Sequence, residues 1–132
     1  MSTKPLERIL YVEDEPDIQT VARLALEMVG GYQVEICSSG REALEQVGPF
    51  APDLILLDVM MPEMDGPSTL EAIRKREDTR ETPVIFVTAK VQSQEIAQYK
   101  GMGALDVIAK PFDPMGLPKE IEEIWNRYCG RE

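Results

Sequence analysis

Acidic side chains follow two apolar runs of this chain, and a threonine and a lysine end two further runs. Glu13 and Asp14 come directly after the segment RILYV, and Asp58 ends the segment DLILLD. Thr88 ends PVIFVT, and Lys110 ends LDVIAK. A polar residue at one strand end is ordinary, because the chain leaves the core there, but the same feature after every buried run indicates a shared site.

The residue types at these positions indicate which chemistry such a site would support. Gathering the carboxylates of Glu13, Asp14 and Asp58 is electrostatically unfavourable unless a cation lies among them. The chain has no histidine, and Cys37 and Cys129 lack metal-ligand spacing, so we expect both to be free thiols. An all-oxygen cluster favours Mg²⁺, which takes one or two carboxylates, waters and a phosphate oxygen.

Five apolar segments alternate with five helical patterns, and this order predicts how the sheet is built. The expected strands are residues 8–13, 32–37, 53–58, 83–88 and 105–110. Strict βα alternation predicts a parallel α/β sheet with helices on both faces, and the second strand is expected at an edge. Ligands of such sheets bind outside the carboxyl ends of the strands, which is where the polar residues would meet.

Two of the expected helices have well-defined apolar positions. In the first, which starts at Pro16 and stops at Gly30, the residues at helical spacing are Ile18, Val21, Leu24, Ala25 and Met28. In the last, one stripe contains Ile121, Ile124, Trp125 and Tyr128. Because Pro118 cannot donate to the carbonyl of Pro114, regular helix is expected to begin near Leu117 or Pro118.

Length and charge limit the class of protein. The chain has 132 residues, of which 43% are hydrophobic, so we expect one domain over residues 1–132 with a core of about 8–128 and no output domain. The net charge of −10 argues against binding to nucleic acid or to an anionic membrane. No segment has the pattern of a signal peptide or a membrane span, which predicts a cytoplasmic protein.

Four motifs together closely resemble the receiver domain of bacterial two-component response regulators. They are VEDEP at 12–16, LLDVMMPEMDG at 56–66, VTA at 87–89 and AKPF at 109–112, and they occur in the family's order over nearly the whole chain. The resemblance implies a flavodoxin-like three-layer sandwich, in which a five-stranded parallel sheet of order 2-1-3-4-5 is covered by five helices.

The resemblance also assigns roles to the acidic residues. Asp58 would be the phosphoacceptor, taking a phosphoryl group from the phosphohistidine of a sensor histidine kinase or a histidine phosphotransfer protein. Asp14, Asp58 and the backbone carbonyl of Met60 would coordinate Mg²⁺, and Glu13 would act through a metal-bound water. The protein would then catalyse its own phosphorylation and autodephosphorylation without turning over external substrates.

Other site residues receive roles in the same way. Lys110 would contact the phosphoryl oxygens or the Asp58 carboxylate, and Thr88 would donate to a phosphoryl oxygen, with the small Ala89 leaving room. The bond from Lys110 to Pro111 is expected to be cis. In the loop after Asp58, Asp65 is expected to cap a helix and Gly66 to adopt an unusual backbone angle.

One position departs from the family, and the function stays open in consequence. Receivers usually carry Tyr or Phe three residues before the lysine, where this chain has Val107, so coupling of the site to the face beside the last strand must be altered or absent. The chain is expected to be a terminal switch or a phosphorelay carrier that signals to an unknown protein, as a monomer or weak homodimer. The alternative is a phosphate-independent interaction module.

A third class of protein fits the sequence less well. A flavodoxin-like electron carrier would need amides and hydroxyls in the first βα loop, whose sequence VEDEPD is acidic instead. An aspartyl-phosphate hydrolase would need a second Asp two residues after Asp58, and that residue is Met60.

Overall fold

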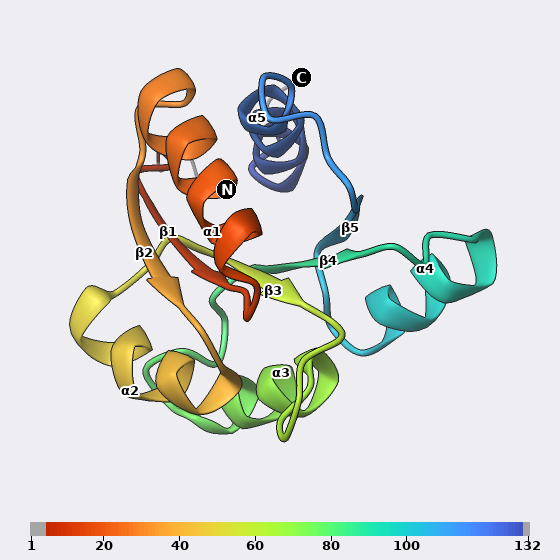
Figure 1. The fold of residues 1–132 in the computed structure, drawn as a ribbon. Coiled ribbons are helices and arrows are strands. Elements are labelled where there is room, and N and C mark those ends of the chain that lie inside the picture. The colour runs from red at the N-terminus through yellow and green to blue at the C-terminus, as the bar shows by residue number, and fades with distance from the viewer. Residues whose placement is uncertain (1–4, 131–132) are drawn as a thin grey trace.

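The computed structural model describes residues 5–130, and a parallel sheet forms its centre (Figure 1). Its strands are β1 (Arg8–Val12), β2 (Gln33–Cys37), β3 (Leu54–Asp58), β4 (Val84–Thr88) and β5 (Asp106–Ala109). All four pairings are parallel, and the strand order is 2-1-3-4-5. The predicted topology and the edge position of β2 are therefore confirmed.

Helices cover both faces of this sheet, which makes three layers (Figure 1). They are α1 (Pro16–Leu24), the π-helical turn η1 (Ala25–Val29), α2 (Gly40–Phe50), α3 (Gly66–Lys75), α4 (Ser93–Gly101) and α5 (Leu117–Tyr128). Residues of α1, η1 and α5 pack in one hydrophobic cluster, and residues of α2, α3 and α4 pack in the other. We call these the first and second core.

The alternation of side chains along β1 divides it between the two cores. Ile9 and Tyr11 belong to the first core, and Leu10 and Val12 belong to the second. Every residue of β3 and β4 is buried, as expected of parallel strands that are covered on both faces. The strand ends that carry the polar residues are thus fixed from both sides.

The face of α1 toward the sheet differs from the one that apolar spacing predicted. Val21, Leu24 and Met28 are 39%, 53% and 78% exposed, whereas Ala22 and Leu26 are fully buried. Small Ala22 lets the helix approach the sheet closely, and the π turn of η1 changes the angular spacing of the residues that follow Leu24. The helix is confirmed, and Ile18 and Ala25 of its predicted apolar face do pack in the first core. The prediction was wrong for the other three residues.

The turn after β3 depends on a close backbone approach at Gly66. Asp65 caps α3 as predicted, since its Oδ1 accepts from the backbone N–H of Ser68 at 2.9 Å. Gly66 does not have the positive φ that we expected. A Cβ at this position would instead lie 2.6 Å from the Asp58 carbonyl oxygen and 2.8 Å from the Val59 Cα. Only glycine allows this contact.

The second half of the chain agrees with several smaller expectations. The peptide bond between Lys110 and Pro111 is cis, and α5 begins at Leu117. Cys37 and Cys129 are free and buried. Within residues 5–130, every helix is too short or too polar to cross a bilayer.

Replacing Gly66 by alanine should destabilise the protein by about 1–3 kcal/mol, because the added methyl group meets backbone atoms that cannot move independently. The matched control is Gly101→Ala at the end of α4, where a Cβ meets nothing within 4 Å. That change should alter stability by less than about 1 kcal/mol, in the favourable direction. Urea denaturation measures both, and equal effects would contradict the close approach at Gly66.

Candidate functional site

The parallel register brings the ends of four strands to one edge of the sheet. Val12 of β1 pairs with Leu57 of β3, so the two residues that follow Val12 lie beside the end of β3. Thr88 and Ala109, the last residues of β4 and β5, are paired, so these two strands end side by side. Glu13 and Asp14 follow β1, Asp58 ends β3, Thr88 ends β4 and Lys110 follows β5. The predicted convergence is confirmed.

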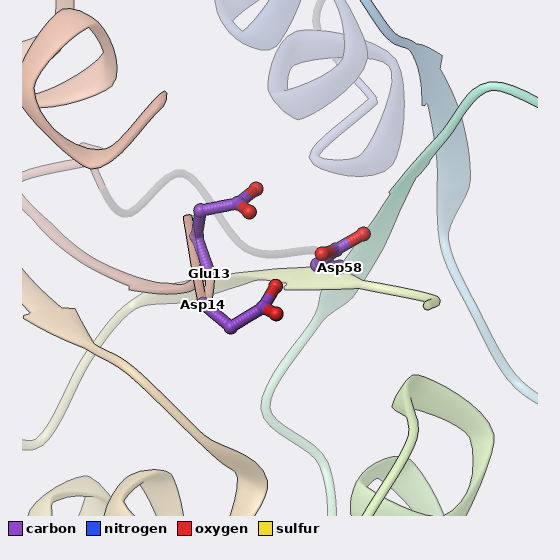
Figure 2. A group of neighbouring side chains, drawn as sticks. All are labelled: Glu13, Asp14 and Asp58. Atoms are coloured by element: carbon purple, nitrogen blue, oxygen red, sulfur yellow. The ribbon is translucent and has the colours of Figure 1, made fainter. Parts of the chain in front are cut away.

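Three carboxylates form the acidic part of the site. One ligand oxygen each from Glu13, Asp14 and Asp58 lies within 4.8 Å of the others. Figure 2 shows Glu13 and Asp14 extending from the end of β1 toward Asp58 at the end of β3. Glu13 and Asp58 are buried and Asp14 is half-buried. This all-oxygen set fits a divalent cation such as Mg²⁺.

A single ammonium group joins two of these carboxylates. Lys110 Nζ lies 2.9 Å from Glu13 Oε1 and 3.3 Å from Asp58 Oδ1. Burial by itself lowers the pKa of Lys110, but the hydrogen bond and charge of Glu13, together with those of Asp58, outweigh burial and raise it. Lys110 is therefore a fixed positive charge at the base of the site.

The lysine offsets only part of the unfavourable energy of the Asp58 carboxylate. Burial, followed by the negative charge of Glu13, raises the pKa of Asp58 to about 6. Lys110 and a hydrogen bond from the Met60 backbone N–H at 3.4 Å act in the opposite direction. Asp58 is thus mostly anionic at neutral pH, which a nucleophile or a metal ligand requires.

Thr88 is 1% exposed, and its hydroxyl faces the same site. Its Oγ1 accepts from the backbone N–H of Lys90 at 3.2 Å, a contact that uses an oxygen lone pair and not the hydroxyl proton. The backbone N–H of Lys110 donates to the Thr88 carbonyl at 2.9 Å. This bond continues the pairing of β4 with β5 into the site.

These side chains line a pocket of about 750 Å³ that is open to solvent. Its polar lining includes Asp14, Asp58, Thr88 and Lys110. Apolar residues line the rest: Ile18 and Val21 of α1, Ala89 after β4, and Pro111 and Phe112 after β5. The exposed side chain of Met60 also lies at the pocket, which is large enough for a small phosphorylated group and a metal ion.

Sequence reasoning missed two contacts to Glu13. The Tyr11 hydroxyl donates to Glu13 Oε1 at 3.1 Å, and the backbone N–H of Glu15 donates to Oε2 at 3.1 Å. The first contact has a signal in the sequence, because residues two apart in a strand lie on the same face. The contact with Glu15 depends on the local backbone turn, which leaves no comparable signal.

A family model of the response regulator receiver domain matches residues 9–122. The chain belongs to this family. Among solved structures, chemotaxis response regulator CheY4 of Vibrio cholerae is 30% identical with a TM-score of 0.83, and the match covers 91% of this chain and 99% of that one. The receiver identity agrees with the sheet order and with the acidic site at its carboxyl edge.

Curated relatives place the domain in two-component signalling. The DNA-binding dual master transcriptional regulator RpaA of Synechocystis sp. is 37% identical over 122 residues, which are 92% of this chain and 50% of that protein. Signal transduction histidine-protein kinase BarA of Shigella flexneri is 37% identical over 106 residues, 80% of this chain and 11% of that protein. The chain spans about half the length of the transcriptional regulators that it matches.

Membership in the family supplies several general properties. Receiver domains are phosphoacceptor switches of two-component systems, they interact with sensor histidine kinases, and they generally bind Mg²⁺ at an acidic pocket. In this chain Glu13, Asp14 and Asp58 form an acidic cluster. Since one relative is a DNA-binding regulator, the expected absence of a nucleic-acid partner stays a prediction.

Replacing Asp58 by asparagine should stabilise the metal-free protein near neutral pH, because it removes a charge that burial and Glu13 disfavour. The folded pKa of about 6 lies above the usual 3.8, so wild type has the full stability of this group below about pH 3.8 and loses it as the pH rises through 6. The advantage of Asp58→Asn should therefore grow from about pH 5 to about pH 7.5, reaching on the order of 1–3 kcal/mol.

Urea denaturation in EDTA at the two pH values measures this difference. Saturating Mg²⁺ should reduce it, because the cation stabilises the anionic form of wild type. An advantage of the same size at both pH values would mean that Asp58 does not titrate in this range.

Proposed function

We propose that Asp58 is the phosphoacceptor of a switch or phosphorelay carrier, supplied by the phosphohistidine of a sensor histidine kinase or a histidine phosphotransfer protein. One observation carries the proposal. Asp58 is the residue of the acidic cluster that contacts Lys110 Nζ and also lines the open pocket through which a donor would approach. The rigid, fully buried strand β3 holds this carboxylate in place.

The proposed transfer is a displacement at phosphorus. A carboxylate oxygen of Asp58 forms the new P–O bond while the P–N bond to the donor imidazole breaks. The electron pair of that bond stays on the imidazole, which leaves as the neutral base because its other ring nitrogen carries a proton taken from solvent. The product is an aspartyl phosphate. The ammonium of Lys110 offsets negative charge as the phosphoryl group enters, and later attack of water at phosphorus would restore the Asp58 carboxylate.

We assign the metal ligands as Asp14, Asp58 and the backbone carbonyl of Met60. When bound there, Mg²⁺ would offset repulsion between the anionic nucleophile and the anionic phosphoryl group. Both oxygens of Glu13 already accept hydrogen bonds, from Tyr11 and Lys110 on Oε1 and from Glu15 on Oε2. This supports a role for Glu13 outside the direct ligand set, through a metal-bound water.

Thr88 and Lys110 would hold the transferred group. The Thr88 hydroxyl proton is not used in its bond with Lys90, so it can donate to a phosphoryl oxygen. Ala89 also lines the pocket, and its small side chain leaves room beside that position. Lys110 can reach the phosphoryl oxygens because its Nζ already lies 3.3 Å from Asp58 Oδ1.

An exposed apolar patch supports a protein as the phosphoryl donor. The patch is formed by Val21, Leu24, Met28 and Val29 of α1 and η1, with Met115 of the segment before α5. Val21 also lines the pocket of Asp58, so the patch and the site are continuous. We infer that the donor protein lies across this patch while the imidazole of its phosphohistidine enters the pocket.

Phosphate-independent binding is the second candidate, and Val107 favours it. The residue is half-buried and packs against the second core, where it has no ring that could report the state of Thr88. A module of this kind would keep the fold and bind its partner without modification.

Incubation with acetyl phosphate and Mg²⁺ should add one phosphoryl group to wild type. Asp58→Asn should gain none, and Asp14→Asn should react at least roughly tenfold more slowly because a metal ligand is lost. Intact-protein mass with and without EDTA measures the gain. No gain by folded wild type in Mg²⁺ would reject the phosphoacceptor and favour the phosphate-independent module, whereas a gain by Asp58→Asn would place the phosphate on another residue.

Met28→Glu should slow transfer from a phosphorylated histidine kinase by roughly tenfold or more, since it puts a charge into the proposed contact. The rate with acetyl phosphate should not change, because Met28 lies outside the pocket lining. Met102→Glu is the matched control, an exposed methionine just after α4. The transfer rates of the two variants are measured with a kinase that phosphorylates wild type. If Met28→Glu accepts the phosphoryl group as fast as wild type, this patch is not the donor surface.

A further inference from the structure

Tyr11 is a polar residue in an otherwise apolar part of the sheet. Its side chain is fully buried in the first core, where β1 lies between β2 and β3. An aliphatic residue or phenylalanine would also fill a core position of this kind. The hydroxyl is what distinguishes tyrosine, and the hydrogen bond that it donates is to Glu13 Oε1, at 3.1 Å.

The contact places Tyr11 behind the functional carboxylates. Residues 11 and 13 point to the same side of β1, so the phenol extends along the strand toward its carboxyl end. Burial and the negative charge of Glu13 raise the pKa of Tyr11, which keeps the hydroxyl protonated. A protonated phenol can donate to the carboxylate at any working pH.

Three donors fix the orientation of the Glu13 carboxylate. Oε1 accepts from the Tyr11 hydroxyl and from Lys110 Nζ, and Oε2 accepts from the backbone N–H of Glu15. The side chain of Glu13 has no solvent exposure, so water does not replace a donor that is lost. The Tyr11 hydroxyl is the donor that comes from the interior of the sheet.

The position of Lys110 depends on this carboxylate. A lysine side chain is a flexible four-carbon stem, and its partners decide where the ammonium lies. Here Nζ is 2.9 Å from Glu13 Oε1, 3.3 Å from Asp58 Oδ1 and 4.0 Å from Oε1 of the exposed Glu15, so the Glu13 contact is the shortest. A Glu13 carboxylate that rotates would therefore take the ammonium away from Asp58.

We propose that Tyr11 is a positioning residue for phosphoryl transfer, because its hydroxyl fixes the Glu13 carboxylate that holds Lys110 beside Asp58. The proposal rests on the proposed function of Asp58, but the order of the Lys110 side chain can be measured without it. Tyr11 does not touch the reacting atoms, and its effect passes through Glu13 and Lys110.

Tyr11→Phe keeps the ring and removes the hydroxyl, so the variant should fold. With acetyl phosphate at saturating Mg²⁺, we expect it to be phosphorylated roughly three- to tenfold more slowly than wild type. Tyr32→Phe is the matched control, since Tyr32 precedes β2 at the opposite end of the sheet from the site. Its rate should equal that of wild type.

A double-mutant cycle separates positioning from a general structural effect. In a Lys110→Ala background, where no ammonium remains to be positioned, Tyr11→Phe should have little further effect on the phosphorylation rate. An equal slowing in both backgrounds would overturn the proposal. The Mg²⁺ affinity, measured by calorimetry, should stay within about twofold of wild type, because the direct ligands are Asp14, Asp58 and Met60.

A second measurement does not require phosphorylation. The NMR order parameter of the Lys110 Cε methylene should fall in Tyr11→Phe and in Glu13→Gln, and not in Tyr32→Phe. If the order parameter falls in both variants but wild type gains no phosphoryl group, Tyr11 positions Lys110 and Asp58 is not the phosphoacceptor. An unchanged order parameter in both Tyr11→Phe and Glu13→Gln would reject the positioning role, whether or not wild type is phosphorylated.

Discussion

A partly exposed ammonium group between two buried carboxylates is the interaction on which this site depends. Without Lys110 Nζ, Glu13 and Asp58 would repel each other where little water is present to separate their charges. The pKa of Asp58, raised to about 6, indicates that one lysine does not offset the whole cost. Asp14 adds a third carboxylate within the same 4.8 Å cluster. The site therefore has an excess of negative charge that suits a divalent cation.

The sheet makes this crowding possible because it fixes each group independently. Asp58 ends a strand that is buried on both faces, and the approach of Gly66 to its carbonyl leaves the following turn little freedom. Glu13 is held by donors from the strand interior and from the loop after β1. Since no single loop carries the site, repulsion among the carboxylates cannot relax by the movement of one segment.

The apolar runs predicted a parallel sheet and the residues at the strand ends, because long apolar runs that stop at a polar residue leave few alternative registers. The strand order 2-1-3-4-5 came from the resemblance to receiver domains. Apolar spacing failed for part of the packed face of the first helix, where Ile18 and Ala25 were correctly predicted and three other residues were not. Val21, Leu24 and Met28 have good helical spacing, but periodicity does not say which of two stripes meets the sheet, and the π turn that follows has no clear sequence mark. The contact of Tyr11 with Glu13 has a sequence signal in their two-residue spacing, but whether the phenol reaches the carboxylate depends on the strand geometry around it.

The face of α4, β5 and α5 limits how the state of the site can be read. Val107 is a β-branched residue, and its short side chain packs against the second core, so it cannot exchange between buried and exposed positions as a ring can. Beside it, Asp106 pairs with Lys100 at 3.7 Å and with Arg127 at 3.2 Å. Such partly exposed pairs are individually weak and can exchange without opening the core. Coupling from Thr88 to this face is therefore either absent or carried by backbone shifts or these ion pairs in place of ring rotation.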